Sequence, residues 1–181
     1  MQMDEGLDTG PVYAKAELQQ DGRVDAGQLT EQLTDMGVAL LAAHLGDIIQ
    51  GVLFSKAQSS AGASYAHKMT KAMAVIDWAG AASVIVCQVR AYCPWPVAVT
   101  TWQGQKLRVW QAQLPPEAVS CSAAAGTLVG IGLDYLDVCC GDGMVVRLLQ
   151  LQREGSTVQS ARDFINARGA LLELGVTQFG R

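Results

Sequence analysis

A short turn with the chemistry of a catalytic loop begins the chain. It reads Leu7-Asp8-Thr9-Gly10-Pro11. Glycine permits a tight backbone turn here, and the proline after it fixes the next φ angle. A carboxylate held in such a turn can orient a histidine or a water molecule for general acid–base chemistry. The alternative is that Asp8 only caps its own turn.

An aromatic segment flanked by prolines is the second candidate for chemistry. Residues 90–96 read Arg-Ala-Tyr-Cys-Pro-Trp-Pro, and the two prolines force a stiff, extended backbone. A rigid aromatic knob of this kind can stack on a nucleic-acid base. It can equally be a hydrophobic plug that docks a helix onto a neighbouring barrel.

Lysines and arginines are the third group of candidates. Lys68 and Lys71 could bind phosphates as mobile point charges, or they could be solvated residues of a linker. Lys106 and Arg108 lie two residues apart on a predicted strand and therefore share one face of it. The sequence does not establish whether that face is functional.

A long amphipathic helix must lie next to the first turn. Asp25 is placed as an N-cap, and Gln28 three residues later completes a capping box. Apolar residues then recur at helical spacing as far as Gly51, which ends the helix. They are Leu29, Leu33, Met36, Leu40, Leu41, Leu45, Ile48 and Ile49. We expect this stripe to cover a sheet whose other strands are absent from the chain, with residues 12–18 as a short strand or extended exit from the turn.

The pattern then changes twice. Residues 53–73 lose all periodicity and gain serines and lysines, which predicts a linker between two domains. A helix follows over residues 79–92, and then five short strands with tight turns, which predict a small barrel that closes on itself. The strands are residues 97–102, 106–113, 127–131, 136–140 and 144–150. Ser160 is placed as the N-cap of a final short helix.

Composition limits the function classes. Half of the 181 residues are apolar and the mean hydropathy is +0.18, so a packed core is expected and no stretch is long enough to span a membrane. Residues 1–60 carry three Lys/Arg against nine Asp/Glu, whereas residues 61–181 carry ten against eight. Only the second part is therefore suited to a polyanion. Five cysteines without a Cys-x-x-Cys pair argue against a zinc site and a disulfide framework, and for small buried thiols in a reducing cytosol.

Taken in order, these motifs resemble the C-terminal part of the methionyl-tRNA formyltransferase family along essentially the whole chain. The resemblance is carried by residues 1–11, by Tyr65-Ala66 with Lys68-Met69-Thr70-Lys71, by Ile76-Asp77-Trp78, by residues 90–96, by residues 107–112, by Cys140-Gly141-Asp142-Gly143 and by residues 160–164. These enzymes move a formyl group from 10-formyltetrahydrofolate to the amino group of methionine on initiator tRNA, in the cytoplasm, as a step of translation initiation.

The resemblance implies roles for individual residues. Asp8 matches the family's catalytic aspartate, which orients a catalytic histidine, and the stretch Asp4, Glu5, Gly6, Leu7 and Asp8 lines the folate site. Lys68, Lys71 and Arg90 are implied to contact the tRNA, and no metal is implied. The family's Asn-x-His pair and its Ser-Leu-Leu-Pro folate loop lie upstream of Met1 in the family pattern. We therefore expect the chain alone to be inactive and the full-length protein to be a monomer.

The implied fold is α+β with two parts. Residues 1–52 are expected to be the C-terminal remnant of a Rossmann-like catalytic domain, as a strand and a long helix. Residues 53–75 are expected to be a linker, and residues 76–181 an OB-like β-barrel that binds tRNA. The expected partners are initiator methionyl-tRNA and folate, with no membrane.

Several residues depart from the family pattern on the tRNA side. Lys71 is followed by Ala72-Met73-Ala74 rather than acidic residues, Cys93 replaces an asparagine, and Ser156-Thr157 replaces a pair of lysines. The loss of charge should weaken phosphate contact. Two alternatives stay open: a sugar-nucleotide formyltransferase of the amino-arabinose type, which residues 76–78 and 160–164 fit less well, and a non-catalytic RNA-binding barrel.

Overall fold

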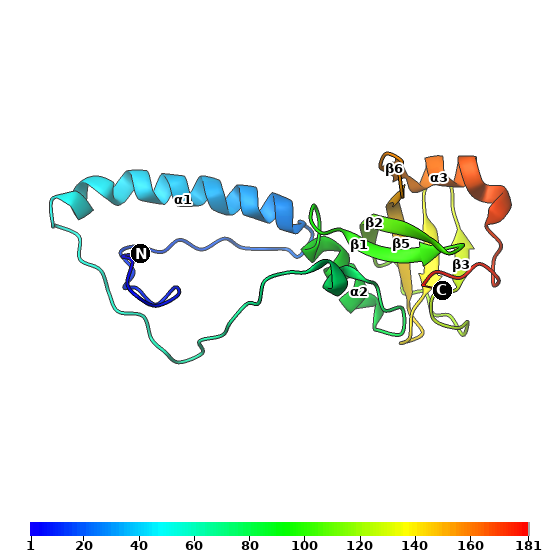
Figure 1. Cartoon of the computed structure of the whole chain (residues 1–181), viewed down its shortest axis with the longest axis horizontal. Helices are drawn as coiled ribbons and strands as arrows, with labels where there is room; N and C mark the ends of the chain where they lie inside the picture. Colours follow the sequence, from blue (N-terminus) through cyan, green and yellow to red (C-terminus); the bar gives the residue numbers. More distant parts are fainter. Residues whose placement is uncertain (181) are drawn as a thin grey trace. The chain divides into compact units, whose positions relative to one another are not determined.

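The computed structural model describes residues 1–180, and the chain divides into two compact units (Figure 1). The first comprises residues 1–68 and the second begins at Met69. This boundary falls within residues 53–75, the predicted linker. The assignment of the two units to a catalytic remnant and a tRNA-binding domain stays a prediction.

The first unit is dominated by one helix, α1 (Ala26–Ile49). Asp25 is its N-cap and forms the predicted capping box with Gln28, whose backbone N–H donates to Asp25 Oδ1 at 2.9 Å. Gly51 follows the C-cap with a φ of 69°, a left-handed angle that glycine adopts without strain. The predicted start and end of this helix are confirmed. None of its residues is buried within the described structure, and Leu33, Leu41, Leu45 and Ile49 of its apolar stripe are exposed.

Residues 12–18 do not form a regular strand. Val12 pairs with Lys56 in an isolated antiparallel bridge, with each backbone N–H donating to the other residue's carbonyl at 2.8 and 2.9 Å. Of the two predicted forms of this segment, the extended one is therefore found. The single bridge ties the start of the chain to the segment that follows α1.

The second unit is an antiparallel six-stranded sheet with short helices. The strands run in the order β1-β2-β5-β4-β3, and β6 pairs with the end of β5. Their bounds are β1 (Ala98–Trp102), β2 (Gln105–Gln113), β3 (Leu128–Ile131), β4 (Leu136–Cys139), β5 (Val145–Arg153) and β6 (Gln159–Ser160). The helices are η1 (Lys71–Ala74), α2 (Ala82–Ala91), α3 (Ala161–Arg168) and η2 (Gly169–Leu171). All five predicted strands, the second helix and the Ser160 cap are confirmed, while β6 and the two 3-10 helices were not predicted.

The sheet is not closed, which corrects the expectation of a barrel that closes on itself. Its edge strands β1 and β3 are joined instead by the segment that contains residues 177–180. Leu128 N–H donates to Thr177 O at 2.9 Å, and Phe179 N–H donates to Gly126 O at 2.8 Å on the β3 side. On the other side Gly180 N–H donates to Thr101 O at 2.9 Å. An irregular segment thus binds both edges of the sheet. Its role could not be predicted from the sequence because the segment lacks the alternation of a strand.

The core lies between the sheet and α2. Helix α2 buries Ile85 and Val89 against the inner side chains of β2 and β5, such as Leu107 and Leu148. Alternation along β2 places Leu107 and Val109 in the core, so Lys106, Arg108 and Trp110 face the other way. The described helices include none long and apolar enough to cross a membrane.

A disulfide joins Cys121 and Cys139, whose Cα atoms lie 6.1 Å apart. This pair corrects the expectation that the cysteines form no disulfide. Successive residues of a strand point to opposite faces, so Cys139 turns toward the loop that carries Cys121 while Cys140 enters the core. Only the fold brings Cys121 to Cys139, so no local motif predicts the pair. The prediction of a small buried thiol holds for Cys140 and is wrong for Cys87, which is exposed.

Candidate functional site

The loop at the start of the chain is closed by Asp4. Its Oδ1 accepts a hydrogen bond from Gly6 N at 3.0 Å and another from the Thr9 hydroxyl at 2.7 Å. Gln2 N–H donates to Pro11 O at 2.8 Å, which fastens the two ends together. Gly10 is buried at this closure, and a Cβ there would collide with the Gln2 carbonyl oxygen. The glycine of the motif is therefore required by close backbone approach.

Asp8 stands out from this loop. Its φ is +58°, in the left-handed region that few residues other than glycine adopt, although aspartate tolerates it better than most. The residue is exposed, and its carboxylate accepts no hydrogen bond from any residue between 1 and 180. The alternative that Asp8 caps its own turn has no hydrogen bond to support it, because Asp4 performs that task. The carboxylate is thus free for another partner.

Gln58 braces the loop from outside and was not found by sequence reasoning. Its side-chain Nε2 donates to the carbonyl oxygens of Asp8 at 2.9 Å and Gly10 at 2.7 Å. The side chain of Gln58 therefore satisfies two backbone carbonyl groups of this loop, as a neighbouring strand would in a sheet. No signal in the sequence marks it, since the contact spans 50 residues.

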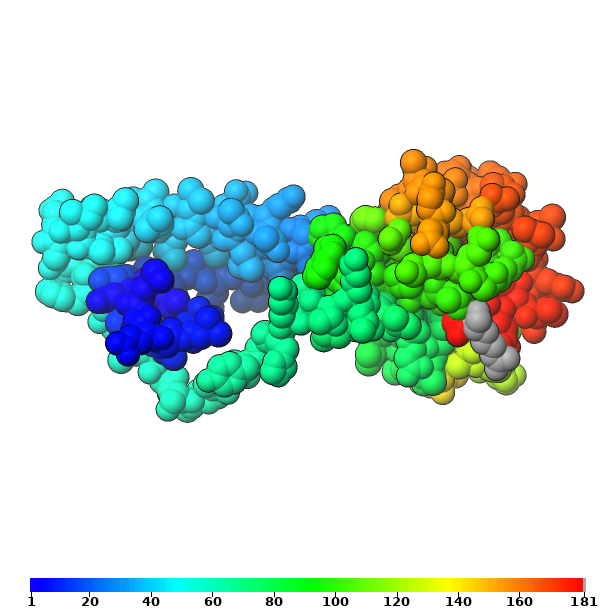
Figure 2. Space-filling model, viewed as in Figure 1, coloured from blue at the N-terminus to red at the C-terminus, as the bar shows by residue number. Residues whose placement is uncertain are grey.

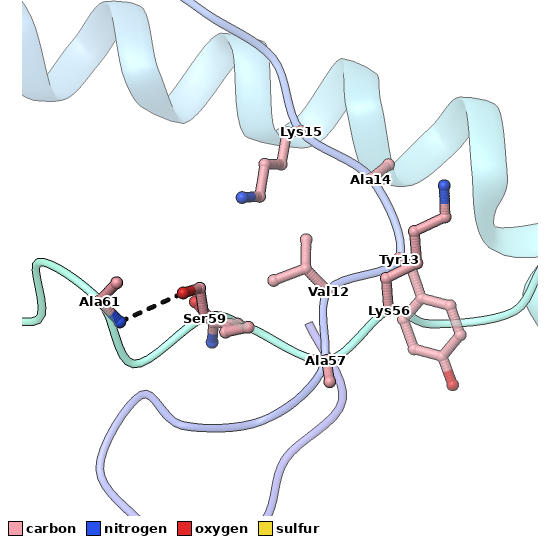
Figure 3. A pocket seen from close by; sticks show the side chains of 9 residues that line it. Val12, Tyr13, Ala14, Lys15, Lys56, Ala57, Ser59 and Ala61 are labelled. Atoms are coloured by element: carbon pink, nitrogen blue, oxygen red, sulfur yellow. Dashed lines mark hydrogen bonds between the residues drawn. The ribbon is translucent and has the colours of Figure 1, made fainter.

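A cavity of about 640 Å³ adjoins this brace. Figure 3 shows Lys15 directed toward the space between the two chain segments that form it. Its walls are Val12, Tyr13, Ala14, Lys15, Lys56, Ala57, Gln58, Ser59 and Ala61. Asp8 is not among them, and it reaches the cavity only through its backbone contact with Gln58. The cavity and the Asp8 carboxylate are therefore separate features of the same unit.

The other residues predicted to line a folate site lie on the same loop. Glu5, Gly6 and Leu7 are all exposed, and the Leu7 side chain is 79% exposed. Of the side chains of residues 4–8, only that of Asp4 makes hydrogen bonds within residues 1–180. The structure therefore brings residues 4–8 together as one exposed ridge.

The predicted RNA-contacting residues are divided between the two units. Lys68 is exposed at the end of the first unit, whereas Lys71 opens η1 and Arg90 lies near the end of α2 in the second. Arg90 is half-buried, and its Nη2 lies 3.2 Å from Cys87 Sγ.

Gln88 links η1 to α2. Its Nε2 donates to Met73 O and to Val75 O, both at 3.0 Å. This pair of bonds holds the elements of Lys71 and Arg90 against one another. Both elements therefore belong to one rigid part of the second unit.

Trp95 does not act as a plug. Its side chain is 52% exposed, whereas the neighbouring Val97 is buried. The interpretation of the aromatic segment as a hydrophobic plug is thus wrong for Trp95. An exposed tryptophan remains suited to stacking.

The strongest electrostatic contact lies elsewhere, on β4 and β5. Arg147 donates from Nε to Asp137 Oδ1 at 2.8 Å and from Nη2 to Asp137 Oδ2 at 2.9 Å. The Tyr135 ring stacks 3.5 Å from the guanidinium carbon. Hydrogen bonding to Asp137 raises the pKa of Arg147 above its already high ordinary value. Both partners are largely buried, so this pair serves the fold.

The buried thiol of Cys140 is unreactive. Burial, with a smaller contribution from the negative charge of Asp142, raises the pKa of its thiol to about 12. A thiol in that state is not a nucleophile at neutral pH. In residues 1–180 there is also no group of three or more His, Cys, Asp or Glu placed to hold a metal ion.

This chain is similar to known proteins along most of its length. A family model described as "Formyl transferase, C-terminal domain" matches residues 68–169. A methionyl-tRNA formyltransferase of Stenotrophomonas maltophilia is 40% identical over 93% of this chain and 54% of its own length. One from Coxiella burnetii is 40% identical over 99% of this chain and 56% of its own. The chain thus spans about half the length of these relatives.

Solved structures share the fold at low identity. HypX from Aquifex aeolicus, in complex with tetrahydrofolic acid, aligns with a TM-score of 0.67 and 17% identity over 94% of this chain and 29% of its own. The sugar 3N-formyltransferase WlaRD aligns with a TM-score of 0.57 and 17% identity over 86% of this chain and 53% of its own. With the family match over more than half of its residues, these findings bear out the resemblance read from the motifs. The chain belongs to the formyltransferase family and carries that family's C-terminal domain in residues 68–169.

Proposed function

We propose that this chain is part of an enzyme that transfers a formyl group from 10-formyltetrahydrofolate to the amino group of initiator methionyl-tRNA. The observation that carries the proposal is the unpartnered, exposed Asp8 carboxylate on a loop braced by Asp4 and Gln58. Relatives named methionyl-tRNA formyltransferase favour the tRNA substrate over a sugar nucleotide. The enzyme would act in the cytoplasm as a monomer, in translation initiation.

Asp8 is the residue we assign to catalysis. Its expected work is to orient a histidine supplied by the remainder of the enzyme and to stabilise the charge that this histidine gains when it accepts a proton from the attacking amine. A carboxylate already used by its own loop could not do this. The bracing of the loop backbone supports the role, because an orienting group must be held in place by its surroundings.

The folate donor would lie along the ridge of residues 4–8, and when bound it supplies the formyl group. The side chains of Glu5, Leu7 and Asp8 fit the rim of such a site, since they are exposed and make no hydrogen bond within residues 1–180. Asp4 would act indirectly, by keeping the ridge in shape. The domain plan would be a Rossmann-like remnant over residues 1–52, a linker over 53–75 and an OB-like, tRNA-binding domain over 76–181.

The second unit would hold the tRNA. Lys68, Lys71 and Arg90 would contact phosphates, and the open strands of the sheet offer an OB-like platform of the kind that binds nucleic acids. The match of residues 68–169 to the family's C-terminal domain supports this placement. The chain alone would bind tRNA without turning over, because a catalytic unit that lacks a member loses orders of magnitude in rate.

A chimera tests the proposal. Residues 1–181 replace the matching part of the Stenotrophomonas maltophilia relative, and the chimera and the chain alone are assayed with 10-formyltetrahydrofolate and initiator methionyl-tRNA. We expect formylation by the chimera and none by the chain alone. Transfer only to a nucleotide amino-sugar, or a chimera that folds but is inactive on both substrates, would overturn the proposal.

A further inference from the structure

The outer face of β1, β2 and β5 has an unusual charge pattern. These three strands contain no Asp or Glu, and this face carries Lys106, Arg108 and Arg147. Arg147 is neutralised by Asp137, but Lys106 and Arg108 take part in no ion pair within residues 1–180. Figure 2 shows the segment of β1 and β2, coloured green, lying at the molecular surface. A carboxylate-free face with unpaired cations attracts a polyanion.

Trp110 completes this face with a fixed aromatic ring. It lies two residues after Arg108 on the outer side of β2, and its indole N–H donates to Gln152 Oε1 on β5 at 2.9 Å. Gln152 in turn donates from Nε2 to Ser156 O at 2.8 Å. The polar edge of the indole is therefore satisfied inside the protein. The side chain is partly buried, so only part of the ring is accessible from outside.

The register of the sheet aligns these residues in one row. Val75 bridges to Val99, Val99 pairs with Arg108, and Arg108 pairs with Gln152. Val75, at the edge of this row, is 58% exposed and follows directly on η1, which begins at Lys71. The row thus starts beside one predicted phosphate contact and ends beside the Trp110 ring.

We propose that Lys106, Arg108 and Trp110 form a binding face for unpaired nucleotides of the tRNA. Lys106 and Arg108 would contact successive phosphates, and Trp110 would stack on a base, which it can do without regard to base identity. The apolar edge at Val75 and Val99 would contact the ribose. This inference rests on the proposed function, because it names where on the second unit that tRNA would be held.

The first test removes the charges. Binding of fluorescently labelled initiator tRNA to the full chain is followed by anisotropy across a salt series. We expect the double variant K106Q/R108Q to bind about tenfold more weakly at low salt and to lower the slope of log affinity against log salt by roughly 1 to 2. The matched control R162Q/R168Q removes the same charge from α3 and should weaken binding less than about threefold.

The second test concerns stacking. W110A should weaken binding to an unstructured RNA oligonucleotide by roughly 5- to 100-fold, whereas W110F keeps a ring and should stay within about threefold of the parent. W110F also loses the bond to Gln152, so a merely structural role would make both variants equally poor. Thermal melting confirms that each variant is folded, and W110L replaces W110A if that variant is not.

The outcomes separate this inference from the proposed function. If the parent chain binds tRNA but K106Q/R108Q and R162Q/R168Q weaken it equally, the face is not the contact surface although the proposed function stands. If W110A binds the RNA oligonucleotide as tightly as the parent does, the inference is overturned as well. If the parent chain binds no tRNA but the chimera still formylates methionyl-tRNA, the proposed binding face is rejected and the proposed enzymatic activity stands. If the parent chain binds no tRNA and the chimera does not formylate it, the proposed function is rejected as well.

Discussion

The Asp4 carboxylate accepts the hydroxyl hydrogen bond of Thr9 at 2.7 Å, and this bond closes the loop from which Asp8 projects. Two aspartates four residues apart therefore have opposite tasks. One holds the backbone, and the other keeps its carboxylate exposed. This division of labour leads to the first prediction.

In the chimera described above, D8N should lower the rate of formyl transfer by at least about 100-fold, the scale of a lost acid–base group. Melting of the protein should not change, because the Asp8 carboxylate makes no hydrogen bond in the described structure. E31Q, which alters an exposed acid of α1 outside the ridge of residues 4–8, is the control and should retain most of the activity. Equal loss in D8N and E31Q would remove Asp8 from its assigned role.

The glycine of the turn between β4 and β5 should tolerate no side chain. A Cβ on Gly141 would collide with the Ala79 carbonyl, and Gly141 N–H donates to Trp78 O at 2.9 Å. We expect G141A to lower the free energy of unfolding by about 2 kcal/mol or more. The control G37A lies within α1 with nothing near its Cβ, and should stabilise the helix by about 0.5–1 kcal/mol. Denaturant titration measures both.

Breaking the ion pair on β4 and β5 should destabilise the second unit. R147Q leaves the Asp137 carboxylate largely buried without its partner. The loss should be about 2–3 kcal/mol, somewhat below the value for a fully buried pair because part of the guanidinium is exposed. R108Q, which breaks no ion pair, is the control for charge, and urea unfolding is the measurement. A loss below that of R108Q would contradict a structural role for the pair.

The disulfide should stabilise the oxidised protein. Cys121 and Cys139 are separated by 18 residues, and a loop of that size gains roughly 3 kcal/mol from its closure. We expect C121S to melt at a lower temperature than the parent under oxidising conditions, and the difference to vanish when both are reduced. C87S alters an exposed thiol outside the pair and should leave the melting temperature unchanged.

Cys140 should make stability fall at high pH. Its folded-state pKa of about 12 exceeds the ordinary thiol value of 9.0 because burial disfavours the thiolate. Between these values the unfolded chain has lost the proton that the folded chain keeps, so stability decreases as pH rises above 9, by up to about 1.4 kcal/mol per pH unit. C140A should flatten this decline in denaturant titrations performed from pH 8 to 11. If the stability of C140A declines with pH as steeply as that of the parent, the raised pKa of Cys140 is refuted.

Local patterns predicted the elements well. The capping box at Asp25 and Gln28, the glycine after α1 and the Ser160 cap depend on residues three or fewer apart, and all were found. The five strands followed from alternation and turn residues in the same way. Local signals suffice where the structure itself is locally determined.

Long-range contacts were missed. The brace from Gln58 to the Asp8 loop and the pairing of Cys121 with Cys139 join residues that only the fold brings together. Family resemblance pointed to Asp8 but not to what supports it. The hydrogen bond from the Trp110 indole to Gln152 could not be predicted from the sequence either, because it requires the pairing register of β2 and β5.

The bonds that residues 177–180 make to both edges of the sheet carry a consequence for biosynthesis. During translation β1 and β3 leave the ribosome well before their shared binding segment, and until residue 180 has cleared the exit tunnel both edges offer unpaired backbone groups to other nascent chains. The interval between these events is the time at which this unit is most in need of a chaperone.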